Sequence, residues 1–251
     1  MNARKSTFDP LSGPAYTEFK RTVQNAISDM TGHLQMAKVA FLSLSREETD
    51  EMMTRGGPVL YIFPCKLRGE VAGNAYVNMQ TAENGWKYGT ICIDLVKYAK
   101  EEFIVMHEVL HAVGMKHEHQ RPSRDAFIKI PLMKRWNDHN VVKLDNKGSG
   151  CIETEEYDYA SIMHYQLVVL KAKVKNEEVL KQCLVKNGLV SVEEQSKEKI
   201  QDNIVGTGRR LSKGDKEWLT KSFAHLPPPN EEAWYEATGR NRFSDNIVPL
   251  L

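Results

Sequence analysis

The residues with the clearest chemical potential lie in one stretch, residues 107–117, which reads HEVLHAVGMKH. His107 and His111 are four residues apart, so on an α-helix they share one face, one turn apart. Two imidazoles placed in this way can bind one Zn²⁺ ion without any change in the backbone. Gly114 can adopt a positive φ, which would end the helix and bring His117 back to the metal from a second direction. Three imidazole ligands with one open coordination position are typical of a catalytic zinc site.

Glu108 follows the first histidine directly and points about 100° away from it around the helix. We therefore expect its side chain to flank the metal rather than to bind it. A carboxylate in that place can accept a proton from a water that zinc has made acidic. The complete spacing, HExxHxxGxxH, is the zinc motif of the metzincin peptidases.

The composition does not point to nucleic acid or a membrane as partner. The 251 residues include 34 Lys and Arg and 33 Asp and Glu, and this near balance gives no reason to expect nucleic acid or an acidic membrane. The mean hydropathy is −0.48, and no apolar run approaches the ~20 residues of a membrane span. The first 14 residues contain no apolar core of a signal peptide, so none is expected in this chain.

The zinc motif needs a framework, and hydrophobic periodicity predicts one. The first half should contain a helix that opens at Pro14, a proline being favourable at the first helical position, and then a twisted sheet that the zinc helix closes. The predicted elements are a helix over 14–34, strands over 37–44, 59–63, 75–79 and 90–93, a short helix over 45–53, and the zinc helix over 97–115.

The second half is less regular. Residues 118–160 lack clean periodicity, and the lysine-rich segment 171–199 is more typical of a solvated face than of a binding patch. Ser212 and Asp215 predict a capping box that opens a last amphipathic helix with Trp218, Leu219 and Phe223 inward.

Three further stretches carry a resemblance to one family. They read HEHQRPSRD (117–125), YDYASIMHY (157–165) and VGTGRRLSKGD (205–215). Together with the zinc motif they resemble the astacin family of zinc endopeptidases, most specifically over 105–165. The resemblance implies an α+β metzincin-type fold. Its upper lobe would hold a twisted mixed sheet and two long helices, and its irregular lower lobe the Met-turn and the C-terminal helix. Residues 1–225 would form the catalytic domain, with its lobes split near residue 117, and residues 226–251 a C-terminal tail.

Carried over to this sequence, the resemblance makes His107, His111 and His117 the ligands of one Zn²⁺ per chain and Glu108 the general base. Tyr165 would stabilise the oxyanion of the transition state, since a phenol can donate a hydrogen bond to developing negative charge.

The same resemblance assigns supporting roles around the metal. Met163 would form an apolar floor beneath it, and Gly114 would redirect the chain. Glu118 matches a family glutamate that meets the buried mature N-terminus, while Arg121 and Asp125 would fix the surrounding loop.

The cysteines and one substitution depart from the family pattern. Ser123 stands where the family usually has aspartate, and none of the four cysteines occupies a usual family position. Two pairings are hypothesised: Cys65 with Cys92 in the strand region, and Cys151 with Cys183 around the Met-turn.

The resulting prediction is a zinc metalloendopeptidase, acting as a monomer on an extended polypeptide that adds to a sheet edge near Tyr76 to Met79. The family resemblance implies secretion, and an intracellular location stays open because no leader is expected here. One alternative is a zinc-binding effector or interaction protein without protease activity. Another is a metal-dependent hydrolase of small amides or esters.

Overall fold

The computed structural model of the chain describes residues 14–36, 47, 50, 54, 59–67, 72–77, 80–81, 87–94, 98, 100–131, 140–145, 154, 156–195 and 204–224. Described residues up to 29 and from 47 to 114 belong to one compact unit, and residues 30–36 and 115–224 to a second. The predicted strand over 37–44 and most of the predicted helix over 45–53 lie outside the described residues, although positions 47, 50 and 54 are helical.

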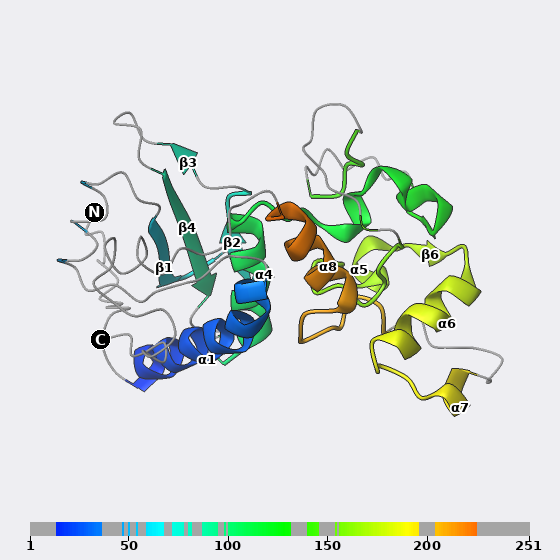
Figure 1. Cartoon of the computed structure of the whole chain (residues 1–251), viewed down its shortest axis with the longest axis horizontal. Helices are drawn as coiled ribbons and strands as arrows, with labels where there is room; N and C mark the ends of the chain where they lie inside the picture. The colour runs from blue at the N-terminus through cyan, green and yellow to red at the C-terminus, as the bar shows by residue number, and fades with distance from the viewer. Residues whose placement is uncertain are drawn as a thin grey trace, which may run out of the picture. The chain divides into compact units, whose positions relative to one another are not determined.

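The first unit contains a mixed sheet centred on β4, which confirms the predicted mixed sheet. Its described strands are β1 (Val59–Cys65), β2 (Gly73–Ala75), β3 (Gln80–Thr81) and β4 (Lys87–Asp94). Strand β4 pairs in parallel with β1 and antiparallel with β2 and β3 (Figure 1). The β-branched and aromatic runs in β1 and β4 suit a pleated, partly buried surface.

One strand was predicted at the wrong place along the chain. The alternation over 75–79 predicted a strand there, but β2 ends at Ala75, and Tyr76 and Val77 lie outside any strand. Residues 73–75 pair with 91–93 of β4 instead. Alternation along one segment says nothing about which residues meet a partner strand, so the pattern alone misplaced this strand by about two residues.

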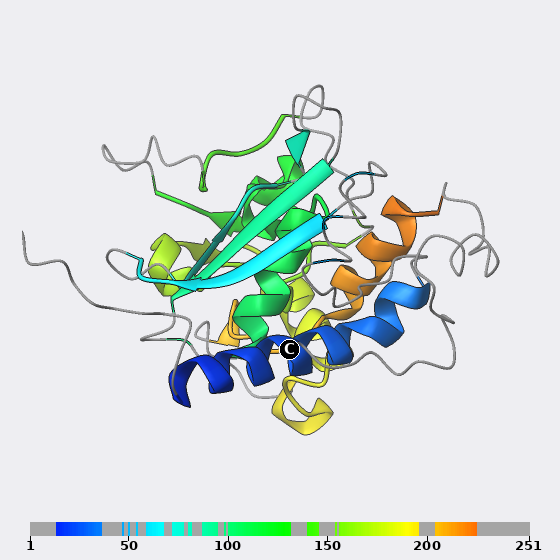
Figure 2. The same ribbon diagram turned by 90° about the vertical axis from the view of Figure 1, so that its left-hand side faces the viewer.

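Two helices accompany the sheet. Helix α1 (Pro14–Met36) begins at Pro14 as predicted, and its buried positions include Phe19, Val23 and Ala26. Helix α4 (Glu102–Ala112) is shorter than predicted at both ends. It packs against β2 and β4 of the same unit (Figure 2), and eight of its 11 residues are buried. The residues of the zinc motif therefore begin on an element that the core holds firmly.

A disulfide between Cys65 and Cys92 joins β1 to β4 and confirms the first hypothesised pairing. It closes a loop with a sequence separation of 27, which corresponds to about 3–4 kcal/mol of stabilisation in the chain-entropy treatment. We expect the double variant Cys65→Ala, Cys92→Ala to lose stability of that order in urea unfolding. Reductant should destabilise the wild-type protein similarly and leave the double variant unchanged. Equal unfolding midpoints for all samples would contradict a stabilising role.

The second unit has short elements around one buried cluster. In chain order they are η1 (Glu118–Gln120), η2 (Pro122–Ala126), β5 (Ile128–Lys129), α5 (Leu167–Leu170), β6 (Lys173–Val174), α6 (Glu177–Lys186), α7 (Val192–Gln195) and α8 (Lys213–Ser222). Strands β5 and β6 form a two-stranded antiparallel sheet. The core cluster includes Tyr157, Tyr159, Leu180, Leu184 and Val205.

Helix α6 was not predicted, because the segment 171–199 is dominated by charge. Leu180, Cys183 and Leu184 nevertheless follow helical spacing and are all buried, while most charged positions of α6 face solvent. The predicted last helix is confirmed as α8, with the Ser212–Asp215 capping box in place and Trp218 and Leu219 buried. Phe223, also predicted to face inward, follows the helix and is half-buried.

Helices and a mixed sheet together confirm the α+β class. Among the described residues, no helix combines the length and the apolar character that crossing a membrane requires. The division into a catalytic domain over 1–225 and a tail over 226–251 stays a prediction, because residues 225–251 lie outside the described part of the chain.

Candidate metal centre

Helix α4 presents His107 and His111 on neighbouring turns. Their ring centroids are 4.7 Å apart and their planes nearly perpendicular. The helix ends at Ala112, and Gly114 has a φ of 107°. This value lies in the region that glycine adopts without a steric penalty, so the predicted turn after the helix is confirmed. Gly114 N also donates to the carbonyl of His111, at 2.9 Å.

His117 supplies the third imidazole of the centre. One potential ligand nitrogen from each of the three histidines lies within 4.8 Å of the other two. His117 Nδ1 is 3.1 Å from Gln120 Oε1; because an amide oxygen only accepts, Nδ1 carries the proton and Nε2 is left for a metal. Three neutral imidazoles are a donor set that zinc prefers, and they leave a coordination position open. The residues present therefore fit a single Zn²⁺ ion.

Gln120 is a supporting residue that the sequence prediction missed. Its Oε1 accepts from His117, and its Nε2 donates to the carbonyl of Val142 at 3.2 Å. These two hydrogen bonds of Gln120 fix both the tautomer and the orientation of the His117 ring. Such partners of ligating histidines commonly set metal affinity. Its position three residues after a ligand histidine was the available signal.

We expect Gln120→Leu to weaken zinc binding by about 10–100-fold, the usual cost of losing such a partner. Leucine has nearly the same volume but cannot accept the proton of His117 Nδ1. Competition with a chromophoric chelator measures the affinity. Gln182→Leu, on the exposed face of α6, serves as the matched control and should bind zinc normally. An unchanged affinity in Gln120→Leu would contradict the assigned role.

Glu108 lies on α4 directly after the first histidine and is 5% exposed. Burial raises the pKa of its carboxyl to about 8, and a hydrogen bond from the Ala75 backbone opposes the rise. A divalent cation nearby would favour the ionised carboxylate. The side chain also lies against Gly73, which belongs to the neighbouring strand β2.

Tyr165 and His119 form an aromatic group with His117. The ring of Tyr165 is centred 4.5 Å from that of His117 and 4.5 Å from that of His119. His119 is fully buried; its Nδ1 accepts from the backbone N–H of Tyr165 at 3.2 Å, and its Nε2 donates to the carbonyl of Asn140 at 2.8 Å. His119 is thus a hydrogen-bonded neutral imidazole that holds the Tyr165 backbone.

Glu118 and Arg121 form a buried ion pair behind this group. Arg121 Nη1 donates to Glu118 Oε1 at 2.7 Å, and Arg121 Nη2 to the Thr154 carbonyl at 2.7 Å. Burial raises the pKa of Glu118 to about 7, and Arg121 opposes the rise. Glu118 N donates to the Met163 carbonyl at 3.1 Å, which links the pair to the Met-turn. The predicted contact of Glu118 with the N-terminus lies outside the described residues.

Asp125 occupies a more exposed place. Its carboxylate pairs with Lys143 at 2.5 Å and with Arg124 at 3.4 Å, and both partners hold its pKa below the usual range, Lys143 the more strongly. Ser123, the substituted family position, is half-buried in η2. Asp125 therefore links Lys143 and Arg124 at the surface, and its loop-fixing role near the metal stays a prediction.

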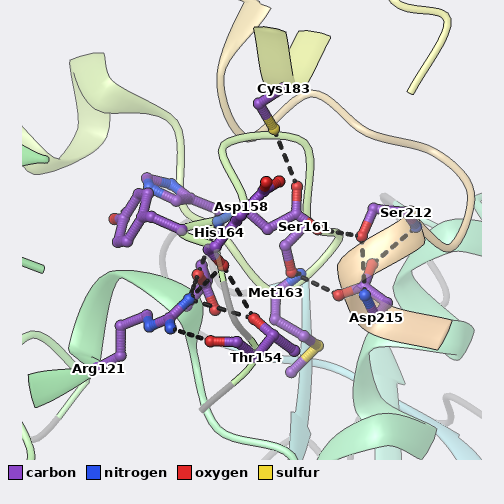
Figure 3. Close-up of polar contacts among 12 residues, drawn as sticks. Arg121, Thr154, Asp158, Ser161, Met163, His164, Cys183, Ser212 and Asp215 are labelled. Atoms are coloured by element: carbon purple, nitrogen blue, oxygen red, sulfur yellow. Dashed lines mark hydrogen bonds and ion pairs between the residues drawn. The ribbon is translucent and has the colours of Figure 1, made fainter. Parts of the chain in front are cut away.

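The Met-turn is tied to the start of α8 by a buried network that was not predicted. Asp215 accepts from Ser161 Oγ at 2.6 Å, from Ile162 N at 3.0 Å and from Ser212 N at 2.9 Å. Ser161 Oγ in turn accepts from Met163 N at 3.0 Å. Dashed lines in Figure 3 join Asp215 to both Ser161 and Ser212. This arrangement fixes the backbone on both sides of Met163.

Asp158 extends the network and corrects the second disulfide hypothesis. Its carboxylate accepts from Ser212 Oγ and, at 3.2 Å, from Cys183 Sγ (Figure 3). Cys183 is a free, buried thiol, and burial raises its pKa well above the usual range. The predicted Cys151–Cys183 pairing is therefore wrong: Cys183 faces Asp158 within the core cluster. Cys151 itself lies outside the described residues.

Comparisons with known proteins agree with this arrangement of residues. The family model for the astacin peptidases matches residues 81–224. Zinc metalloproteinase nas-12 of Caenorhabditis elegans is 38% identical over 65 residues, 26% of this chain and 17% of that protein. Low choriolytic enzyme of Oryzias latipes is 44% identical over 64 residues, 25% of this chain and 22% of that protein. The matched segment thus spans about a fifth of these relatives' length.

One solved structure was also matched, at lower sequence identity. High choriolytic enzyme 1, a hatching enzyme zinc-protease from Oryzias latipes, aligns over 82% of both chains with a TM-score of 0.47 and 17% identity. The family match covers more than half of the present chain, from before the zinc motif to the end of α8. The chain belongs to the astacin family of peptidases.

Proposed function

We propose that this chain is a zinc-dependent endopeptidase that hydrolyses internal peptide bonds of polypeptides. The observation that carries the proposal is the grouping of three imidazoles, with ligand atoms within 4.8 Å of one another, and a buried carboxylate on the same helix as two of them. A structural zinc site needs no such carboxylate and normally has a fourth protein ligand. Membership of the astacin family supports the same reading.

Each residue of the site has a separate role in the proposed peptide hydrolysis. A bound Zn²⁺ supplies Lewis acidity, which polarises the scissile carbonyl and acidifies water near neutral pH. Glu108 accepts the proton of the attacking water, holds it on its carboxylate and returns it to the leaving amine. The Tyr165 hydroxyl donates a hydrogen bond to the oxyanion. Met163 and Gln120 keep the metal's surroundings in place, and neither takes part in proton transfer.

We propose further that the substrate binds in extended form along β2. Among the described strands, β2 pairs only with β4, so its other edge can accept a peptide strand. The predicted edge near Tyr76–Met79 moves accordingly to Gly73–Ala75. Tyr76, which follows β2 and is 63% exposed, would then contact a substrate side chain. The peptide would add antiparallel to the strand.

The test is cleavage of unfolded casein by the purified protein. We expect cleavage that a zinc chelator abolishes and that added zinc restores, because the three imidazoles alone cannot acidify water. Metal analysis should give one zinc per chain. Absence of cleavage by protein that holds one zinc would favour the zinc-binding effector reading. Cleavage of small amides or esters without any polypeptide would favour the other hydrolase reading.

We propose that the protein works in an oxidising compartment. The Cys65–Cys92 disulfide supports it, because structural disulfides form and persist in secreted and extracellular proteins and are rare in the cytosol. We propose that the enzyme is secreted and acts as a monomer. Thiol labelling of protein from its natural source should find Cys65 and Cys92 oxidised; reduced cysteines there would contradict secretion.

A further inference from the structure

Strand β2 comes unusually close to the side chain of Glu108. A Cβ atom placed on Gly73 in ideal geometry would lie 2.7 Å from Glu108 Oε1, 2.8 Å from its Cγ and 3.0 Å from its Cδ. Contacts under 3.0 Å to a Cβ atom are essentially not found in proteins. Any residue other than glycine at this position therefore requires either the strand or the Glu108 side chain to move.

The strand is the less free of the two. Gly73 is paired with Ile93 of β4, and next to this pair the N–H of Asp94 donates to the Ala72 carbonyl at 2.9 Å. Moving β2 outward would break this hydrogen bond and disturb the pairing of β2 with β4. The atoms in the way of a new Cβ all belong to the flexible side chain of Glu108, which can change rotamer at a cost of order 1 kcal/mol.

We propose that Gly73 is a positioning residue that sets the place of the Glu108 carboxylate. Its bare Cα leaves the room that the carboxylate occupies, and the Ala75 backbone N–H on the same strand donates to that carboxylate. Glu108 is thus held between its own helix and the edge strand along which substrate is proposed to bind. This inference rests on the proposed function, in which Glu108 moves the proton.

The variant Gly73→Ala tests the inference with little risk to folding, because the displaced atoms are side-chain atoms. We expect kcat for a casein-derived peptide to fall about 10–100-fold, since a misplacement of about 1 Å near the reacting atoms costs on the order of 10²-fold. KM, zinc content and the thermal midpoint should stay near wild type. Lys66→Ala, at an exposed position just after β1 and away from the proposed site, is the control and should keep full kcat.

If Gly73 had only a structural role, the effect of Gly73→Ala on kcat would not depend on the length of the acidic side chain at position 108. In a Glu108→Asp background the carboxylate retreats by one methylene, so Gly73→Ala should lower the remaining kcat several-fold less than in the wild type. An equal loss in both backgrounds, or wild-type kcat in Gly73→Ala, would overturn the proposal. So would an equal kcat loss in Lys66→Ala.

A crystal structure of Gly73→Ala separates this inference from the proposed function. We expect the Glu108 carboxylate to be displaced by about 1 Å or more, with β2 still paired to β4 and the three histidines unmoved. An undisplaced carboxylate overturns the positioning role whether or not the protein is active. Inactive wild-type protein with one bound zinc overturns the endopeptidase instead, and a displaced Glu108 would still support the positioning role of Gly73.

Discussion

Replacing Glu108 by glutamine should lower kcat for peptide hydrolysis by about 10²–10⁴-fold and leave the zinc content unchanged. Glutamine keeps the size and shape of the side chain but cannot take up a proton at neutral pH. Glu108 is 5% exposed, so bulk water cannot easily replace it as proton acceptor. The three imidazoles are intact in this variant, and zinc binding should therefore persist.

Steady-state kinetics on a casein-derived peptide and metal analysis of the same samples measure the two expectations. Glu102→Gln, at the start of the same helix, controls for loss of a carboxylate from α4 and should keep wild-type kcat. His107→Ala provides the opposite pattern, with loss of both zinc and activity. Turnover of Glu108→Gln near that of the wild type would remove Glu108 from its proposed role.

The parts of the site that were predictable from sequence are those whose interacting residues lie within one or two helical turns of each other. The spacing of His107 and His111 determines their common face, and the turn at Gly114 needs only a residue that tolerates positive φ. The capping box of Ser212 and Asp215 is equally local. Each of these features was confirmed because the interacting atoms lie close together in the chain.

The contacts that escaped prediction join segments distant in sequence. Gly73 meets Glu108 from another element, and Asp215 holds Ser161 across 54 positions. The Cys151–Cys183 pairing failed for the same reason, since the sequence could not tell that Cys183 faces Asp158 inside a core. Helix α6 was missed because the segment was judged by its many lysines and glutamates. Among them, three buried positions keep helical spacing.

The network around Asp215 predicts the second large effect. Asp215→Ala should lower the free energy of unfolding by at least about 3 kcal/mol, because three buried donors lose their acceptor at about 1–3 kcal/mol each. These donors are Ser161 Oγ and the backbone N–H groups of Ile162 and Ser212. The α8 capping box is lost with them. Urea unfolding measures the change, and Asp29→Ala, on the exposed face of α1, is the control.

Asp215→Asn separates the hydrogen bonds of this residue from its charge. The amide oxygen can still accept from the two backbone N–H groups, and its NH₂ can donate to Ser161 Oγ, so a smaller loss than for alanine is expected. Burial and the neighbouring Asp158 raise the pKa of Asp215 from 3.8 to about 6. The folded wild-type protein therefore binds more protons than the unfolded chain between these values, and ionisation of Asp215 makes it less stable as pH rises through that window.

Asparagine does not titrate, so the stability difference between wild type and Asp215→Asn should shrink from pH 4 to pH 7. Urea unfolding of both proteins in chelator gives this difference, because the titration of the metal-site histidines is then common to both and cancels. A gap that stays constant or widens toward pH 7 would mean that the buried carboxylate is stabilised, rather than strained, by its charge. In that case the Met-turn would be held by an ionised Asp215 throughout this pH range.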